Sequence, residues 1–504
     1  MSRNREIELK LEADAGSGDA LASVPLLGGP PATVANQLSV YFDTPDGLLR
    51  DAGFSLRVRQ SGKRFIQTVK HSDATAAGLF DRREWEEDVA GLELDPEAAA
   101  RTPVAEILTK KVRKRLQPLV RVEVRRSTWN LVSDGSRIEL VLDEGFVEGG
   151  EARQHITEVE LELESGDESA LFGVARTLGE AVALRLGVLA KSERGYRLAD
   201  GTAGKAVKSE PIRLGRTMVS ADGFAAIAYA CLRQFRLNEP LVVEKQDASA
   251  LHQARVAMRR LRSAFTLFRP VIADERFQEL REEVRWFTDQ LGDARNLDVL
   301  LKRFGSGSPD NPAAGALAAK LSSEREVAYA NVLEALGSQR LRTLMLDLVA
   351  WIETGPWRHE NELAQLPLRQ FASLQLDKRW KKVRKGGRNL AQLEPEARHR
   401  LRIEVKKLRY AVEFLASLTV GEAAIAKQKQ FGRALEDMQE ELGELNDLET
   451  ARTLLGNLLD GEADSDAMMG FARSKLEAPA SEEAQLGGAQ EAHAQLLEVG
   501  RFWR

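Results

Sequence analysis

The first part of the chain alternates apolar and polar residues with a period of two. The alternation runs from Ile7 to about Leu163 and is clearest in the segments Val120–Arg125 and Ile138–Asp143. A period of two is typical of antiparallel strands that bury one face. Turn sequences such as Thr44-Pro45-Asp46-Gly47 separate these segments at the intervals that hairpins require. We therefore predict an antiparallel sheet across this part of the chain.

Two stretches interrupt the alternation, and both favour a helix. They lie near Val104–Leu116 and Glu168–Leu186, and we expect the strand-rich part to close around Tyr196. The predicted fold class of this part is α+β, built on an antiparallel β-barrel.

The second part of the chain has a helical period instead. Glycines and a proline break both periods between residues 201 and 217, which we interpret as a linker. Beyond the linker, the apolar positions in Leu251–Phe265 and in Leu401–Leu415 suit long amphipathic helices. We predict a barrel domain over residues 1–200 and an all-α helical bundle over residues 218–504.

The helical part contains an internal repeat. His252–Arg262 aligns without gaps on His399–Arg409, and further along Leu291–Asp298 matches Leu442–Glu449. Two copies of one helical unit are the simplest explanation, because chance similarity rarely preserves spacing. The predicted copies span residues 218–305 and 368–460, and a loop is expected at residues 305–312.

Composition limits the class of protein. The 504 residues are 43% hydrophobic and 30% charged, so the chain is too apolar to be disordered and too long for one ordinary core. Cys231 is the only cysteine, and no apolar run is long enough for a signal segment or a membrane span. We therefore expect a cytoplasmic protein without a membrane partner. The formal net charge of −5 says little about binding partners, because Lys and Arg are gathered in particular segments.

Charged residues share one face of several predicted strands. Near the start, Glu6, Glu8 and Lys10 alternate with Ile7 and Leu9. A single strand of this kind is usually the solvated face of a sheet. The alternation recurs, however, at Arg57 and Arg59, Glu84 and Glu86, Arg121, Glu123 and Arg125, Glu139 and Asp143, and Glu158, Glu160 and Glu162. If the sheet curls into a barrel, these faces line a lumen that carries charge of both signs.

A lumen of this kind suits a metal-bound polyphosphate. Carboxylate oxygens bind Mg²⁺ or Mn²⁺, while Arg and Lys neutralise the remaining phosphate charge. Phosphoryl transfer then needs mainly positioning and electrostatic stabilisation, and a metal with a nearby base can activate water. The chain contains neither G-x-x-x-x-G-K-[ST] nor H-E-x-x-H, so the sequence supports neither a P-loop nor a zincin mechanism.

The N-terminal motif Glu6-x-Glu8-x-Lys10 resembles the ExExK signature of the CYTH, or triphosphate tunnel metalloenzyme, superfamily. The resemblance covers about residues 1–200. Further segments match in order and approximate spacing, namely Tyr41–Thr44, Leu56–Arg59, Gln67–Lys70, Arg83–Glu86, Glu158–Glu162 and Lys191–Tyr196.

The resemblance implies a role for each matching charged residue. The implied metal ligands are Glu6, Glu8, Glu158 and Glu160, with Glu162 as an alternative to Glu158 because the alternating glutamates leave the register open. The implied basic, substrate-binding wall consists of Lys10, Arg57, Arg59, Lys70, Arg125 and Lys191. Glu84 and Asp143 would complete the acidic wall.

A histidine and three cations repeat along one face of two predicted helices. The first set is His252, Arg255, Arg259 and Arg262, and the second is His399, Arg402, Lys406 and Arg409. A single set of this kind is as often a solvated basic face as an anion-binding site. Its repetition, with a histidine in the same place, favours anion binding. The nearby basic run Lys378–Lys385 could extend the surface. Metal binding by the histidines is the alternative that the surrounding cations disfavour, and base stacking on Trp380 or Tyr410 is another.

This part of the chain resembles the CHAD domain, an α-helical module that is often fused to CYTH domains and is associated with inorganic polyphosphate. The match covers roughly Met218 to Arg504 and rests on the two copies of His-x-x-Arg-x-x-x-[Arg/Lys]-[Arg/Lys]-Leu-Arg. The resemblance implies long-chain polyphosphate as a partner, and we do not expect a nucleic acid partner.

Three functions suit these features. The first is hydrolysis of inorganic triphosphate to pyrophosphate and phosphate, with Mg²⁺ or Mn²⁺. The second keeps the lumen but acts on thiamine triphosphate or a nucleoside triphosphate, or cyclises ATP, although no base-recognition pocket is evident in the sequence. The third is a non-catalytic polyphosphate-binding scaffold, which would not require so many carboxylates.

Overall fold

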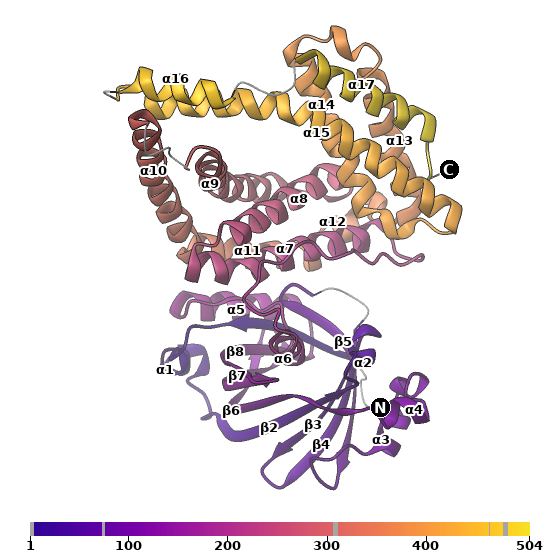
Figure 1. The fold of residues 1–504 in the computed structure, drawn as a ribbon. Coiled ribbons are helices and arrows are strands. Elements are labelled where there is room, and N and C mark those ends of the chain that lie inside the picture. Colours follow the sequence, from indigo (N-terminus) through magenta and orange to yellow (C-terminus); the bar gives the residue numbers. More distant parts are fainter. Residues whose placement is uncertain (1–4, 73–75, 306–310, 463, 477–481, 504) are drawn as a thin grey trace. The chain divides into compact units, whose positions relative to one another are not determined.

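Eight strands close into an antiparallel barrel in the first part of the chain, as the alternation predicts (Figure 1). These are Arg5–Glu12 (β1), Thr33–Asp43 (β2), Phe54–Ser61 (β3), Arg64–His71 (β4), Leu79–Val89 (β5), Gln117–Ser133 (β6), Ser136–Gly149 (β7) and Ala152–Ser165 (β8); a short ninth strand spans Arg185–Leu186 (β9). Their order is β5-β4-β3-β2-β6-β7-β8-β1, with β9 beside β1, and pairing between β1 and β5 closes the barrel. This computed structural model describes residues 5–72, 76–305, 311–462, 464–476 and 482–503.

Short helices connect the strands. They span Gly18–Ala22 (α1), Leu48–Asp51 (α2), Pro96–Ala100 (α3), Lys110–Arg113 (α4), Ser169–Ala181 (α5) and Lys191–Ala199 (α6), with 3-10 turns at Pro25–Leu27 and Pro103–Glu106. The helical stretch predicted near Val104–Leu116 is a 3-10 turn followed by the short helix α4. Thr109 is extended there, and its side chain caps α4 by accepting from the Val112 amide, so the stretch is divided into a turn and a short helix. The second predicted helix is α5, which ends before β9 begins.

The barrel interior is charged only in part. An apolar cluster fills the remainder, formed by Tyr41, Val120, Val122, Val124, Val147, Ile156 and Tyr196. Helix α6 packs against β6 and β7 at this cluster. Gly195 permits the contact, because a Cβ at this position would lie 2.1 Å from a methyl carbon of Val120. The packing places Lys191, the first residue of α6, at the charged section of the interior.

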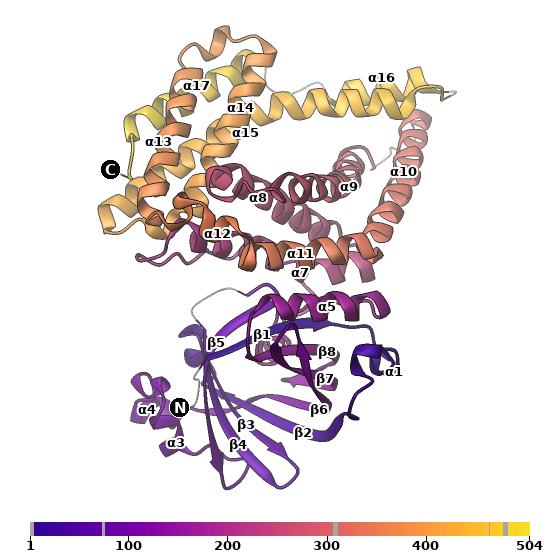
Figure 2. The ribbon, with the colours of Figure 1, turned by 180° about the vertical axis from the view of Figure 1, so that it is seen from behind.

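Long helices form the second part of the chain, as the helical period predicts (Figures 1 and 2). They span Ser220–Lys245 (α7), Ala248–Ile272 (α8), Phe277–Phe304 (α9), Pro312–Gly337 (α10), Gln339–Thr354 (α11), Leu368–Gly386 (α13), Pro395–Phe414 (α14), Glu422–Leu459 (α15), Ser465–Leu476 (α16) and Glu482–Val499 (α17), and the short helix Trp357–Glu360 (α12) lies between α11 and α13 in the chain. The loop predicted at residues 305–312 lies largely outside the described residues, and α10 begins at its end.

The internal repeat corresponds to two helix pairs. In each copy the first repeated segment lies on one helix, α8 or α14, and the second lies on the next long helix, α9 or α15. Within each pair the helices contact each other, and α8 also contacts α14. Aromatic side chains form part of the core around them: Phe268 of α8 stacks on Phe371 of α13 with ring centroids 4.8 Å apart. The repeated segments therefore lie on corresponding helix pairs, and the bounds of the two copies stay predictions.

The chain forms two compact units. Residues 1–207, 232–241 and 338–355 form the first unit, which contains the barrel, and the remaining residues form the second, helical unit. Among the described residues, no helix has both the length and the apolar character that a membrane span requires.

Candidate active site

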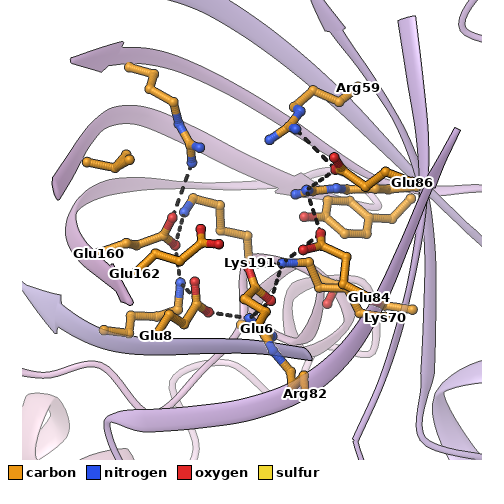
Figure 3. Close-up of a pocket in the computed structure, with 18 of the residues that line it drawn as sticks. Glu6, Glu8, Arg59, Lys70, Arg82, Glu84, Glu86, Glu160, Glu162 and Lys191 are labelled. Atoms are coloured by element: carbon orange, nitrogen blue, oxygen red, sulfur yellow. Dashed lines mark hydrogen bonds and ion pairs between the residues drawn. The ribbon is translucent and has the colours of Figure 1, made fainter. Parts of the chain in front are cut away.

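A charged cavity of about 230 Å³ lies inside the barrel (Figure 3). Strand β1 directs Glu6, Glu8 and Lys10 into it, because alternate side chains of a strand point to the same face. The cavity is lined by Glu6, Glu8, Lys10, Tyr41, Ser55, Arg57, Arg59, Lys70, Arg82, Glu84, Glu86, Arg126, Glu139, Val141, Glu160, Glu162, Ala190, Lys191 and Ser192. Most of these side chains are ionisable, so the charge pattern determines what the cavity can bind.

Lys191 is the centre of a buried cluster of carboxylates. Its Nζ lies 2.7 Å from Glu160 Oε1, 2.9 Å from Glu158 Oε2 and 2.9 Å from Asp143 Oδ2. Burial alone would lower the pKa of Lys191, but these three carboxylates raise the pKa well above its ordinary value. Lys191 is therefore permanently charged and held in position.

Glu160 is shared between this cluster and two further cations. It contacts Lys10, and Arg126 lies 3.2 Å from Glu160 Oε2 while its Nε donates to Asp143 Oδ1 at 2.8 Å. Burial would raise the pKa of Glu160, but Lys10, Lys191 and Arg126 hold it well below its ordinary value. The positive and negative charges balance in this part of the cavity.

Glu162 is not balanced in the same way. Glu8 and Glu162 are direct partners across β1 and β8. Burial, together with Glu6, Glu8 and Glu84, raises the pKa of Glu162 to about 8. Burial and three nearby carboxylates thus outweigh the effect of Lys70 on Glu162. We call Glu6, Glu8 and Glu162 the acidic pole.

Arg59 of β3 shows the opposite imbalance. Arg57 lies 3.8 Å from Glu84, and Arg59 lies 3.2 Å from Glu86. The neighbouring Arg57, followed by burial, lowers the pKa of Arg59 to about 10. A guanidinium whose pKa is lowered by another guanidinium has too little negative charge beside it. We call Arg57 and Arg59 the basic pole.

The donors of the acidic pole fit a hard divalent cation. Carboxylate oxygens are the ligands that Mg²⁺ and Mn²⁺ prefer, and Glu162 lacks sufficient positive charge in its surroundings. Within the described ranges, however, no three acidic, histidine or cysteine side chains already stand in the arrangement that a metal ion requires. The carboxylates are instead engaged by cations of the chain, such as Lys70, whose Nζ lies 2.6 Å from both carboxylate oxygens of Glu6.

In the helical unit, the two predicted basic faces meet at one tyrosine. We call His252, Arg255, Arg259 and Arg262 of α8 the first stripe, and His399, Arg402, Lys406 and Arg409 of α14 the second stripe. Arg259 Nε donates to the hydroxyl of Tyr410 at 2.8 Å, and the Arg409 guanidinium lies over the same ring, 4.5 Å from its centroid. The stripes are therefore neighbouring parts of one surface.

Positive charge accumulates at the first stripe. Burial, followed by Arg295, Arg259 and Arg255, lowers the pKa of His252. Burial and two of the same arginines also lower the pKa of Arg255, although Asp293 and Asp289 partly compensate. An anion bound here would relieve this repulsion.

The aromatic rings near the stripes are not open to nucleic acid bases. Trp380 is 6% exposed and Tyr410 is 3% exposed. Base stacking requires an accessible ring face, so these two rings do not support the alternative of nucleic acid binding.

Comparison with known proteins accounts for both units. A model of the CYTH domain matches residues 4–196, and a model of the CHAD domain matches residues 226–456. The chain joins a CYTH domain to a CHAD domain. The inorganic triphosphatase of Haemophilus influenzae is 30% identical over 200 residues, which are 38% of this chain and 55% of that protein. The chain thus spans about half the length of this curated relative.

Solved structures are similar to each domain separately. The CHAD domain of the plant Ricinus communis is 30% identical, and the match covers 56% of this chain and 96% of that chain with a TM-score of 0.49. A Hippeastrum protein described as having a dominant triphosphatase activity is 19% identical, with coverage of 39% and 96% and a TM-score of 0.31.

Most residues predicted for the CYTH site line the cavity, and their roles stay predictions. They are Glu6, Glu8, Lys10, Arg57, Arg59, Lys70, Glu84, Glu160, Glu162 and Lys191. Asp143 and Glu158 do not line it; they are fully buried and contact Lys191 from behind. Of the alternating glutamates, Glu160 and Glu162 therefore face the cavity.

The placement of Arg125 in the basic wall is wrong. Its side chain is 57% exposed, lies 3.6 Å from Glu144 and belongs to the outer surface of the barrel. On β6 the interior face is the one that carries Val120, Val122 and Val124, and alternation continues that face to Arg126. Arg126 therefore takes the position that we predicted for Arg125.

Arg82, Arg126 and Tyr41 line the cavity but were not predicted as site residues. For Arg82 a signal existed, since it shares its strand face with Glu84 and Glu86 of the CYTH motif. For Arg126 the signal was the valine alternation just before it. Tyr41 lies in a matching motif, but nothing in its sequence context indicates that its hydroxyl pairs with Arg57.

Proposed function

We propose that the CYTH domain hydrolyses inorganic triphosphate to pyrophosphate and phosphate in a reaction that depends on Mg²⁺ or Mn²⁺. The observation that carries the proposal is the presence of an acidic and a basic pole in one cavity. A divalent cation and a short polyanion together compensate both poles, whereas either ligand alone compensates only one. The similarity to the Haemophilus influenzae triphosphatase supports this substrate class.

The acidic pole would hold the metal. Glu6, Glu8 and Glu162 present carboxylates toward one region of the cavity, and Glu160 borders it. A bound Mg²⁺ or Mn²⁺ would supply a hard positive charge for phosphate oxygens and would acidify a water molecule.

The basic side chains would hold and orient the triphosphate. Arg57 and Arg59 carry planar guanidinium groups that bind phosphate oxygens in a bidentate way. Lys70 and Lys191 add point charges, and Lys191 is fixed by three carboxylates, so it does not need to reorganise when charge shifts toward the leaving pyrophosphate. In this proposal the protein contributes positioning and electrostatic stabilisation, and no side chain acts as a nucleophile.

The dimensions and lining of the cavity favour inorganic triphosphate over a nucleotide or thiamine triphosphate. The volume is about 230 Å³, and in the part of the chain that the structure describes Tyr41 is the single aromatic residue of the lining. Tyr41 is 5% exposed and is engaged with Arg57, so it offers no open ring face to a base.

One comparison tests the proposal. Phosphate release from tripolyphosphate, ATP and thiamine triphosphate should be measured side by side, with Mg²⁺, with Mn²⁺ and with chelator. We expect tripolyphosphate to have the highest kcat/KM and chelator to abolish turnover. Preference for ATP or thiamine triphosphate would overturn the substrate assignment, and turnover in chelator would overturn the metal.

We further propose that the CHAD domain binds long-chain polyphosphate. The specific observation is that Tyr410 joins the two stripes into one surface, so a long polyanion can contact several cations at once. Affinity should fall steeply as salt rises, by analogy with other linear polyanions that release counterions.

The full-length protein in chelator can be titrated with long-chain polyphosphate, tripolyphosphate and duplex DNA. The double variant Arg259→Ala/Lys406→Ala should weaken polyphosphate binding and flatten its salt dependence. Arg473→Ala/Lys475→Ala, on exposed positions of α16, serves as a charge-matched control. Preference for DNA at equal charge concentration, or an unchanged double variant, would contradict the assignment.

A further inference from the structure

Arg82 occupies the space between the two N-terminal glutamates of the acidic pole. Its position on β5 is the direct partner of Glu6 on β1. Its guanidinium contacts Glu8 and lies 3.4 Å from Glu6 Oε2 (Figure 3). Phe80 packs on the guanidinium, with its ring centroid 4.8 Å away. The Arg82 side chain is 11% exposed, so its charge is poorly screened by water.

This arrangement opposes a metal ion that arrives alone. A divalent cation at Glu6 and Glu8 would have to displace the guanidinium from Glu8, and it would lie beside a partly buried positive charge. The contact also accounts for the observation that, over the described ranges, the acidic side chains are not arranged as a ready metal site.

A triphosphate would offer the same guanidinium another partner. Arg82 lines the cavity itself, and guanidinium groups bind phosphate oxygens at least as well as carboxylates. An anion in the cavity can therefore draw Arg82 away from Glu8 and supply negative charge of its own. Both changes lower the energy of a cation at the acidic pole.

We infer that Arg82 is an internal counter-ion that makes metal and triphosphate binding depend on each other. Without substrate it neutralises Glu6 and Glu8 and weakens metal binding; with substrate it turns to the phosphate and releases the carboxylates. The metal thus competes with Arg82 for Glu8, and the triphosphate recruits Arg82. The inference rests on the proposed function, since it assumes that Glu6 and Glu8 bind the metal.

The decisive measurement is the affinity for Mn²⁺ alone, titrated in the full-length protein by the loss of the free-ion electron paramagnetic resonance signal. Arg82→Met should bind Mn²⁺ about tenfold more tightly than the wild type, because a positive charge beside the site is removed. The same variant should bind tripolyphosphate more weakly in chelator. If Arg82 only maintains the structure of the site, Arg82→Met should instead bind Mn²⁺ more weakly than the wild type, because a disturbed site binds both ligands more weakly.

Matched variants make the result specific. Arg83→Met removes a charge from the next position of β5, which is exposed on the outer face, and should leave Mn²⁺ affinity unchanged. Arg82→Lys retains the charge and should resemble the wild type. If Arg82→Met does not fold, Arg82→Gln removes the charge while it keeps hydrogen-bond donors for Glu6 and Glu8, and the tighter Mn²⁺ binding is expected there.

The outcomes separate this inference from the proposed function. Suppose that the wild type binds Mn²⁺, that Glu8→Gln loses this binding, and that a folded neutral Arg82 variant binds Mn²⁺ no more tightly than the wild type. This result overturns the role of Arg82 but supports the metal site. Wild-type Mn²⁺ binding that Glu8→Gln does not affect overturns the metal site, and with it the inference.

Discussion

Glu8 and Glu160 both face the cavity, but their surroundings differ. Glu8 is engaged mainly by Arg82, whereas Glu160 contacts Lys10, Lys191 and Arg126. Removing the charge of Glu160 reduces the compensation of three buried cations, whereas removing the charge of Glu8 mainly affects Arg82. Substitution of the two residues should therefore affect activity and the free energy of unfolding differently.

Glu8→Gln should abolish metal-dependent hydrolysis because a hard oxygen ligand is lost, and it should lower the free energy of unfolding less than Glu160→Gln does, because it mainly reduces the compensation of Arg82 alone. Glu160→Gln should abolish activity and also lower the free energy of unfolding by about 3 kcal/mol. Initial rates with saturating metal and urea denaturation measure the two effects. Glu123→Gln on the outer face of β6 is the control. Near-normal turnover in Glu8→Gln at subsaturating metal would contradict the assigned site.

Arg59→Ala should lower kcat/KM by about two orders of magnitude, or roughly 2.7 kcal/mol, because it removes half of the basic pole that stabilises the triphosphate. Arg125→Ala is a matched control, since this arginine lies on the outer surface and should be dispensable. Steady-state kinetics at several metal concentrations provide the measurement. Recovery of Arg59→Ala at high metal would show that the residue acts on the metal instead.

Among the elements, α6 connects the apolar cluster of the barrel with the charged cavity. It begins at Lys191, and Gly195 allows its close approach to β6. Gly195→Ala should therefore destabilise the protein by about 1–3 kcal/mol, because overpacking shifts the helix. Activity should fall with stability, since Lys191 moves with α6. Gly173→Ala on α5 meets open space and should be neutral or slightly stabilising in the same thermal and kinetic measurements. Equal behaviour of the two variants would refute this account of α6.

The first stripe on α8 predicts a pH dependence of polyphosphate binding. Burial, with Arg295, Arg259 and Arg255, lowers the pKa of His252 below its ordinary value of 6.5, so the free protein gains this proton only at lower pH. A bound polyanion favours the protonated form, and affinity should therefore rise as pH falls below about 6.5. In the protein without polyanion, the lowered pKa of His252 means that protonation of His252 reduces the free energy of unfolding as pH falls through this range. Titrations at several pH values should show a smaller rise in His252→Gln, whereas His359→Gln on α12 should match the wild type.

For the whole molecule, the two proposed activities should be separable. Glu8→Gln should lose triphosphate hydrolysis but retain polyphosphate binding, and Arg259→Ala/Lys406→Ala should show the reverse. The reason is that the acidic pole and the stripes belong to different compact units and share no residue. Hydrolysis and binding assays on both variants test this independence. Loss of both activities in either variant would indicate that the activities are coupled.

The sequence by itself determined the fold class, the duplication and most members of the candidate site. Periods of two and 3.6 residues follow directly from strand and helix geometry, so alternation identified Glu6, Glu8 and Lys10 as sharing a face before any contact was known. The recurrence of His252–Arg262 at His399–Arg409 likewise required two similar helices. These are local properties of the chain, and local geometry is what a sequence pattern encodes.

The tertiary structure decided which faces point inward and which charges meet. On β6 both faces carry regular patterns, and only barrel closure placed Val124 and Arg126 inside and Arg125 outside. The pairing of Lys191 with Asp143 and Glu158, and the meeting of Arg259 with Tyr410, join residues that are far apart in the sequence. Electrostatic energy depends on distance and burial, which periodicity does not contain, so the acidic pole, the basic pole and the position of Arg82 emerge only when the strands close.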